Sequence, residues 1–165
     1  MRSPAVFPEE AGSLLSLPIL CGMGRPGLRI LREKEASALR LWHEALLHRL
    51  PRAQLLGQHR ECCALRGLAW GKRHAVVDYV FRHPREWLAV YHERVMAEME
   101  RRGYRVEPLW KDPAYCGRRR PAVLPDEEAL SQARARIPVY PEHDAAYRLA
   151  CLENLQRKGI RLPEA

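Results

Sequence analysis

The chain has 165 residues, enough for one domain with a proper hydrophobic core and too few for two domains of ordinary size. Lysine and arginine outnumber aspartate and glutamate by 28 to 20, which gives a formal net charge of +8. The longest apolar stretch, SLLSLPILCGMG, is too short to cross a bilayer, and five cysteines without a C-x-x-C pair fit reduced thiols, so we expect a cytoplasmic protein.

The excess positive charge is concentrated in the middle of the chain. Residues 39–120 carry 17 basic and 9 acidic groups, whereas the segments on either side are nearly balanced. A basic block inside an otherwise balanced protein favours a polyanionic partner, and nucleic acid is the commonest one. The alternative is an arginine-rich composition that serves no such partner.

Residues 1–38 show no sustained helical period before the stretch LRILREKEASALRLW. The segment GMGRPG matches the G-x-G-x-x-G pattern of dinucleotide sites, but a proline interrupts it and no strand-turn-helix unit surrounds it. We therefore expect a poorly structured N-terminal extension and no bound cofactor.

Three helices follow, each bounded by residues that start or stop helices. The first is expected after Pro51 and runs to about Arg66, directly before Gly67. The second begins at HPREW, where Pro84 favours the first helical turn, and ends at RRGY, where Gly103 stops the helix.

The third helix is expected to begin at YPEHD, where Pro141 precedes acidic residues, and to end at QRKGI with basic residues and Gly159. Helical spacing also predicts which side chains of the second and third helices face inward. They are Trp87, Leu88, Tyr91, Val95 and Met99 in the second helix, and Ala146, Leu149, Ala150 and Leu152 in the third.

The connections between the helices are less regular. The segment AVVDYVF, residues 75–81, fits a short strand or an extended apolar stretch. Residues 107–140 are rich in proline and include CGRRRP, which predicts a long loop rather than a packed element.

The most unusual stretch of the first helix is LLGQHRECCALRG, residues 55–67. Glu61 continues a polar stripe with Gln54 and Gln58, whereas Cys62 and Cys63 continue the apolar side of the helix. Adjacent cysteines on a helix point about 100° apart and cannot easily share a tetrahedral metal, so we expect no metal site. The arginine and glutamate at its centre are then either functional or a solvated pair on a surface helix.

Three longer segments decide between these interpretations. From LRLWHEALLHRLPRAQLLGQHRECCALRG through WGKRHAVVDYVF to ERVMAEMERRGY, the chain resembles the pyrimidine-dimer DNA glycosylase family, also known as phage-type endonuclease V, and within it a bacterial branch. The resemblance covers roughly residues 39–160. It implies an all-α, compact single domain of about three main helices with long loops, formed by residues 39–165.

The resemblance also implies a chemistry. In this family the α-amino group of the chain's own N-terminus attacks the sugar C1′ of the damaged nucleotide, expels the base and leaves an imine that undergoes β-elimination. Leu39 falls at that terminus, Glu61 matches the essential glutamate, and His74 aligns with a histidine near the site. An α-amine suits this role because its pKa lies near 8, against about 10.4 for lysine, so more of it is neutral at pH 7.

The partner implied by the resemblance is double-stranded DNA with damaged pyrimidines. We expect the protein to be a monomer and to bind no membrane. Pyrimidine dimers, oxidised pyrimidines and abasic sites all remain open as substrates, and RNA remains open as the polyanion. The side chains expected to contact DNA are Arg40, His59, Arg60, Arg66, Lys72 and Arg73.

The nucleophile is the point at which this sequence departs from the family. Leu39 lies inside the stretch ASALRLWHE, and its nitrogen there belongs to a peptide bond, which cannot form an imine. Either Leu39 represents the true start codon and residues 1–38 are not made, or a protease frees the same amine, or the long form is catalytically silent. The last case corresponds to the alternative function, a non-catalytic nucleic-acid-binding protein of the same fold; a small metal-binding protein is a third.

Overall fold

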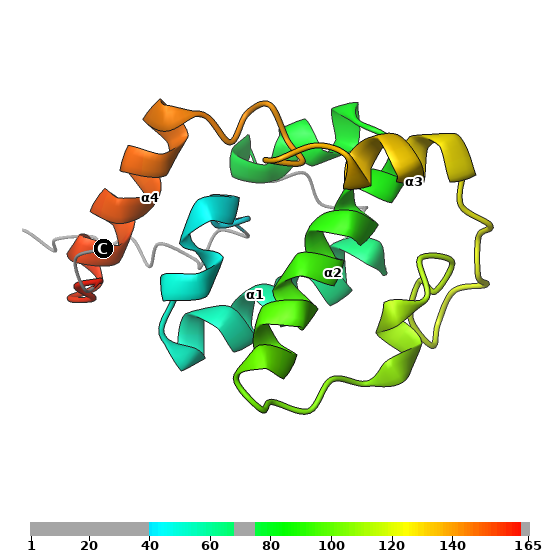
Figure 1. Ribbon diagram of the computed structural model, residues 1–165, viewed down its shortest axis with the longest axis horizontal. Coiled ribbons are helices and arrows are strands. Elements are labelled where there is room, and N and C mark those ends of the chain that lie inside the picture. The colour runs from blue at the N-terminus through cyan, green and yellow to red at the C-terminus, as the bar shows by residue number, and fades with distance from the viewer. Residues whose placement is uncertain (1–39, 68–74, 163–165) are drawn as a thin grey trace, which may run out of the picture. The chain divides into compact units, whose positions relative to one another are not determined.

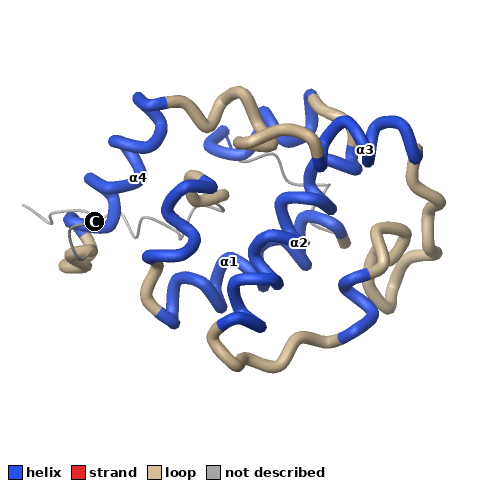
Figure 2. The backbone as a smooth tube through the Cα atoms, viewed as in Figure 1, coloured by secondary structure: helices blue, strands red, loops and turns tan. Residues whose placement is uncertain are grey.

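A computed structural model describes residues 40–67 and 75–162 of the protein (Figure 1). The predicted N-terminal extension lies outside the described residues. Within them all regular structure is helical and no strand occurs (Figure 2), as the resemblance predicted. In chain order the elements are η1 (Glu44–Arg49), α1 (Arg52–Arg66), η3 (Ala75–Arg82), α2 (Arg85–Arg101), η4 (Pro108–Lys111), α3 (Glu127–Arg134) and α4 (Ala145–Arg157), where η marks a 3-10 helix.

Proline and glycine set the boundaries of α1 and α2 as predicted. α1 begins directly after Pro51 and ends before Gly67, whose N–H bonds to two carbonyls of the last turn at 3.0 and 3.2 Å. α2 begins after Pro84 and is followed by Gly103, whose φ of 76° lies in the left-handed region that favours glycine. The first two predicted helices are therefore confirmed at both ends.

α2 is the central helix of the domain. It packs beside α1 (Figure 1) and also contacts η1, η3 and α3. All five side chains predicted to face inward are buried, and α2 buries further residues on its other faces because helices surround it. Each fully buried side chain of this size contributes about 1.5–3 kcal/mol of hydrophobic free energy.

The segment 75–81 is helical rather than extended. It forms η3, from which Tyr79 and Val80 are buried against the core. An isolated strand would leave its N–H and C=O groups without partners, and the described residues offer no second strand to pair with it. A helical conformation satisfies these groups within the segment.

The proline-rich segment 107–140 is more ordered than a loop. It contains η4 and α3, and α3 packs against α2 through Leu130 and Ala133. The Asp126 side chain caps α3 by accepting hydrogen bonds from the N–H groups of Glu128 and Ala129. Two inward-facing side chains in eight residues are too few to produce a clear periodic pattern.

The third predicted helix exists as α4, but its start and its buried face differ from the prediction. It begins at Ala145, because Asp144 caps it by accepting from the N–H of Tyr147 at 2.7 Å, and Gly159 (φ 74°) follows its end as predicted. Its buried side chains are Cys151 and Leu155. The inward set was wrong for Ala146, Leu149 and Ala150, which are exposed, and Leu152 is half-buried.

A charged cluster fastens η1 to the end of α2. Arg102 donates hydrogen bonds to the carbonyls of Leu47, His48 and Leu50, at 2.6 to 3.1 Å. The Glu98 carboxylate in turn accepts from the Nε of Arg102 at 2.5 Å. These carbonyls belong to the last residues of η1 and the connection to α1, so the cluster satisfies acceptors that the helix cannot.

We predict that Glu98→Gln destabilises the fold in a pH-dependent way. Hydrogen bonds from Arg101 and Arg102 hold the pKa of Glu98 at about 2, below the usual 4.5. Because the folded-state pKa is lowered, the stabilisation is present above pH 4.5 and is lost as pH falls toward about 2. Urea denaturation at pH 7 should show a loss of about 1–2 kcal/mol, shrinking toward zero near pH 2.

Glu100→Gln is the matched control on the same helix. Glu100 pairs with Lys111, and both side chains are about half exposed, so its loss should change stability little at either pH. Equal effects of the two substitutions at pH 7 would contradict the role assigned to Glu98.

Candidate active site

The first described residues of the chain run along the polar stripe of α1. The backbone N–H of Trp42 donates to Oε1 of Gln58 at 2.7 Å. One turn further along α1, the Glu61 carboxylate accepts a hydrogen bond from the backbone N–H of Arg40. Two backbone N–H groups of residues 40–42, which we call the entry segment, are thus held by two side chains of one helix.

Gln58 connects these two contacts. It is fully buried, and its Nε2 lies 3.4 Å from Oε2 of Glu61 and 3.8 Å from Sγ of Cys62. The amide therefore accepts from the entry segment at one end and donates toward the glutamate at the other. This arrangement fixes the side-chain position of Glu61 without neutralising its charge.

Glu61 has a carboxyl group suited to proton transfer. Burial raises its pKa from 4.5 to about 7, against the opposing effects of the Arg40 N–H and the positive charges of Lys158, Arg40 and Arg60. A carboxyl group with such a pKa can both donate and accept a proton near neutral pH. The surrounding cations also favour an anionic ligand such as a phosphate group.

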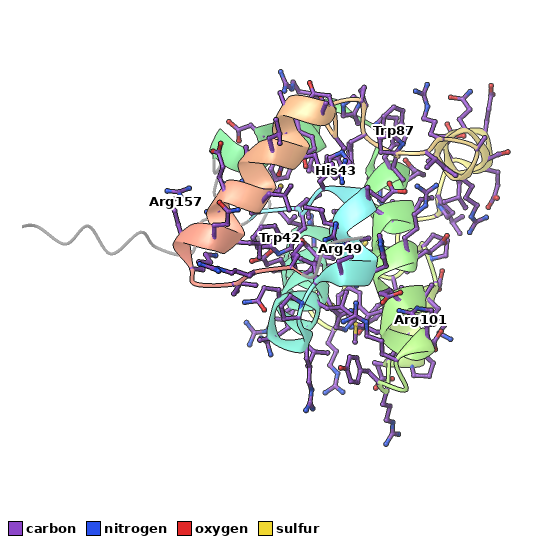
Figure 3. All side chains as sticks on the ribbon, turned by 60° about the vertical axis from the view of Figure 1, so that its left-hand side comes forward. Trp42, His43, Arg49, Trp87, Arg101 and Arg157 are labelled. Carbon is purple, nitrogen blue, oxygen red and sulfur yellow. The ribbon has the colours of Figure 1, made fainter. Side chains whose placement is uncertain are left out.

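The entry segment is held from its other sides as well. The Tyr91 hydroxyl, from α2, donates to the carbonyl of Trp42 at 2.6 Å, and the Tyr147 hydroxyl, from α4, donates to the carbonyl of Leu41 at 2.5 Å. Lys158 at the end of α4 lies over the Trp42 ring. Figure 3 shows Trp42 close to the α4 ribbon. Three helices therefore determine the path of this backbone.

His43 completes the attachment to the start of α4 (Figure 3). Its Nε2 donates to the carbonyl of His143 at 2.7 Å, and its Nδ1 accepts from the N–H of Ala45 at 3.1 Å. His143 is buried, and burial lowers its pKa to about 3, so it is neutral at physiological pH. Its Nε2 lies 2.9 Å from the Tyr79 hydroxyl. These groups form a neutral, fully hydrogen-bonded support.

The predicted site residues divide into three groups. Arg40 is half-buried beside Glu61, and Arg60 is exposed on the same turn of α1. Arg66 is buried, and its guanidinium donates to backbone carbonyls at 2.6 to 3.0 Å, so it is not available to a DNA phosphate. His59 is half-buried, and its Nδ1 lies 2.8 Å from Nε2 of His92 on α2. Leu39, Lys72, Arg73 and His74 lie outside the described residues.

Several residues of the site were not predicted from the sequence. Gln58 was placed on the polar stripe without a role, although its position one turn before Glu61 was the available signal. Tyr147 lies in α4 and Lys158 directly follows that helix, and their separation of more than 80 residues from Glu61 leaves no local signal. Only the tertiary structure brings them to the entry segment.

Comparison with known proteins adds a family. A family model described as pyrimidine dimer DNA glycosylase matches residues 39–112, which include the entry segment, α1, η3 and α2. No curated protein and no solved structure matches the chain significantly. None of the described helices has the length and apolar character needed to cross a membrane. The resemblance inferred from the sequence is confirmed over residues 39–112, the part of the chain that the pyrimidine dimer DNA glycosylase model matches.

Proposed function

We propose that this protein is a DNA glycosylase and abasic-site lyase that acts on pyrimidine dimers or related pyrimidine lesions in double-stranded DNA. The observation that carries the proposal is the position of Glu61, whose carboxylate accepts a hydrogen bond from the backbone N–H of Arg40. A chain that starts at residue 39 would have its α-amino group one residue away from this contact. The family match supports the proposal, since it begins at the same residue.

In the proposed reaction the α-amine of residue 39 forms a bond to C1′ of the damaged nucleotide. The bond between C1′ and the base breaks, and the base leaves with its electron pair and takes up a proton. Loss of a proton from the nitrogen and protonation of the ring oxygen then open the sugar to an imine, from which β-elimination cleaves the strand. In this scheme Glu61, whose pKa is raised to about 7, supplies and removes these protons.

The entry segment explains why a terminal amine can be an efficient nucleophile here. A free chain end would normally lose much conformational entropy when it is placed against a substrate. In this protein the two residues that follow Arg40 are fixed by Gln58, Tyr91 and Tyr147. In the proposal, a chain that starts at residue 39 would therefore begin beside a backbone that the fold already holds before DNA binds.

DNA binding is assigned to the positive charges around Glu61. Arg60 is exposed, Arg40 is half-buried, and Lys158 acts on the same carboxyl group. Lys72 and Arg73 remain proposed phosphate contacts, and His74 remains a proposed neighbour of the site. Contacts of this kind make affinity fall steeply with salt, and the target base must leave the stack to be attacked.

The proposal requires a free amine at residue 39. In the full chain this nitrogen lies in a peptide bond, which favours the second candidate, a nucleic-acid-binding protein without catalysis. Translation from Leu39 or proteolysis before it would provide the amine. The two candidates differ in whether a covalent intermediate with DNA can form.

Borohydride reduction can detect this intermediate, because it converts an imine into a stable covalent adduct. A chain beginning with Met at position 39 should be trapped on duplexes that carry a thymine dimer or an abasic site, whereas the full chain should not. Glu61→Gln in the shorter chain should abolish trapping and keep salt-sensitive DNA binding, because glutamine cannot transfer the proton.

Glu93→Gln is the matched control, because Glu93 pairs with Arg134 on the exposed side of α2 and should not affect trapping. Full trapping by the Glu61→Gln variant would refute the role of Glu61. If both the shorter and the full chain bind DNA and neither is trapped, the non-catalytic candidate is supported instead.

We predict that Gln58→Leu in the shorter chain lowers both the stability of the fold and the rate of adduct formation. The substitution leaves the N–H of Trp42 without its acceptor and releases Glu61 from the amide, so stability should fall by about 1–3 kcal/mol. The rate of adduct formation should fall as well, while DNA affinity at fixed salt stays unchanged. Gln132→Leu, on the exposed face of α3, is the control and should change neither the stability nor the rate of adduct formation. An unchanged rate for Gln58→Leu would contradict the positioning role of Gln58.

A further inference from the structure

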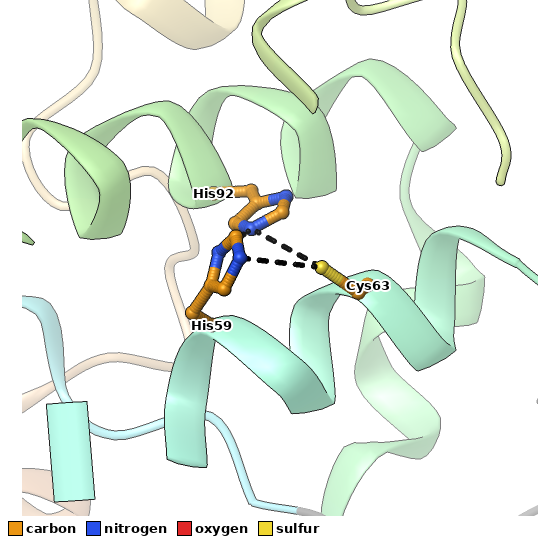
Figure 4. A group of neighbouring side chains, drawn as sticks. All are labelled: His59, Cys63 and His92. Carbon is orange, nitrogen blue, oxygen red and sulfur yellow. Dashed lines mark hydrogen bonds between the residues drawn. The ribbon is translucent and has the colours of Figure 1, made fainter. Parts of the chain in front are cut away.

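A second polar cluster lies on the side of α1 that faces α2. It consists of His59 and Cys63, one turn apart on α1, and His92 from α2 (Figure 4). Sγ of Cys63 lies 3.7 Å from Nε2 of His59 and 3.9 Å from Nε2 of His92. One ligand atom from each residue can be chosen so that all three lie within 4.8 Å of one another.

We propose that His59, Cys63 and His92 bind one transition-metal ion of the zinc class, with three protein ligands and one coordination position open to solvent. The proposal is independent of the function proposed for Glu61.

The distances from Sγ of Cys63 to the two histidine nitrogens fit a tetrahedral ion. Zinc bonds of about 2.3 Å to sulfur and 2.0–2.1 Å to nitrogen place the two ligand atoms about 3.6 Å apart. The two sulfur-to-nitrogen distances, 3.7 and 3.9 Å, are close to this separation. Residues four apart on a helix face the same direction, which is why His59 and Cys63 can share an ion.

Burial leaves one side of the cluster open. His92 is fully buried between α1 and α2, whereas His59 and Cys63 are only half-buried. An ion held by these three side chains would therefore keep access to water on the side of His59 and Cys63. Three protein ligands with an open fourth position are typical of zinc sites that bind a further ligand.

The same atoms form a hydrogen-bonded chain that metal binding would replace. Arg66 Nη1 lies 3.2 Å from Nδ1 of His92, and because arginine only donates, the His92 proton lies on Nε2. That N–H donates to Nδ1 of His59 at 2.8 Å, which leaves the Nε2–H of His59 facing Cys63. Both imidazoles are neutral donors and acceptors in this arrangement.

Metal binding requires a defined set of proton movements. The Cys63 thiol releases its proton to solvent, and His59 and His92 each move the remaining proton to the nitrogen that faces away from the ion. His92 Nδ1 then carries a proton and faces the N–H of Arg66 Nη1, so the hydrogen bond between these two atoms is lost, and Arg66 Nη1 keeps only its bond to the Trp110 carbonyl at 2.8 Å. The nearby charge of Arg66 favours the thiolate and opposes the cation, so binding should be weaker than at a closed structural site.

The sequence predicted no metal site because Cys62 and Cys63, as adjacent residues, cannot easily share an ion. The structure separates them, since Cys62 is buried against Gln58 and Cys63 faces the two histidines. The missing ligand was His92, which lies 33 residues after His59 on another helix. An ion at this position would fasten the α1 turn that carries Arg60 and Glu61 to α2.

The test uses the untagged full chain after dialysis against a chelator. Titration with Co²⁺ should give the near-ultraviolet band of a thiolate-to-cobalt transition and the visible bands of tetrahedral Co²⁺, with saturation at one equivalent. Calorimetric titration with Zn²⁺ should give the same stoichiometry. Zinc should also raise the unfolding temperature, because an ion that binds only the folded state stabilises it.

The variants Cys63→Ala and His59→Ala identify the ligands, and both residues are half-buried, so the fold should persist. Removing a residue that hydrogen-bonds to a metal ligand typically lowers metal affinity by about 10–100-fold, so removing a ligand itself should lower the affinity for zinc at least as far. Cys63→Ala should also remove the near-ultraviolet band, whereas the matched control Cys62→Ala should keep both band and affinity. Absence of binding to the full chain, or binding that survives both ligand substitutions, would overturn the proposal.

Discussion

The hydrogen bonds between the entry segment and the polar stripe of α1 are the constraint on which the site depends. A buried backbone N–H without a partner costs about 1–3 kcal/mol, so α1 must offer acceptors where the segment crosses it. The Gln58 side chain accepts from the N–H of Trp42, and the Glu61 carboxylate accepts from the N–H of Arg40. The same two side chains therefore fix the backbone that leads to residue 39 and place a carboxyl group beside it.

The parts of the fold that follow from local chemistry could be predicted from the sequence. Pro51 and Pro84 cannot donate a backbone hydrogen bond, and Gly103 adopts a left-handed φ at no steric cost. Such residues favour the start or the end of a helix whatever the tertiary context. The orientation of α4 depends instead on distant partners. The Tyr147 hydroxyl bonds to the Leu41 carbonyl, 106 residues away, and no pattern within α4 contains this information.

The site shows the same division between local and distant information. Glu61 and Arg40 were identified through the resemblance, because the segments that carry it include both residues. Lys158 was not identified, since it reaches Glu61 from the end of α4, and the cysteine pair was interpreted without the histidine of another helix. Local sequence therefore indicated the carboxyl group that is proposed to react, whereas the residues that set its charge and position came from the tertiary contacts.

α1 separates two polar systems that use different faces of the same turn. His59 and Cys63 face α2, and Glu61, placed about 200° further round the helix than His59, faces the entry segment. A change in one system can reach the other through the rigid position of the helix, because the peptide bonds of residues 59–63 are common to both. An electrostatic connection exists as well, since Arg60 acts on both the Glu61 carboxyl group and the His59 imidazole. Ligation between α1 and α2 would therefore be expected to change how firmly Glu61 is held.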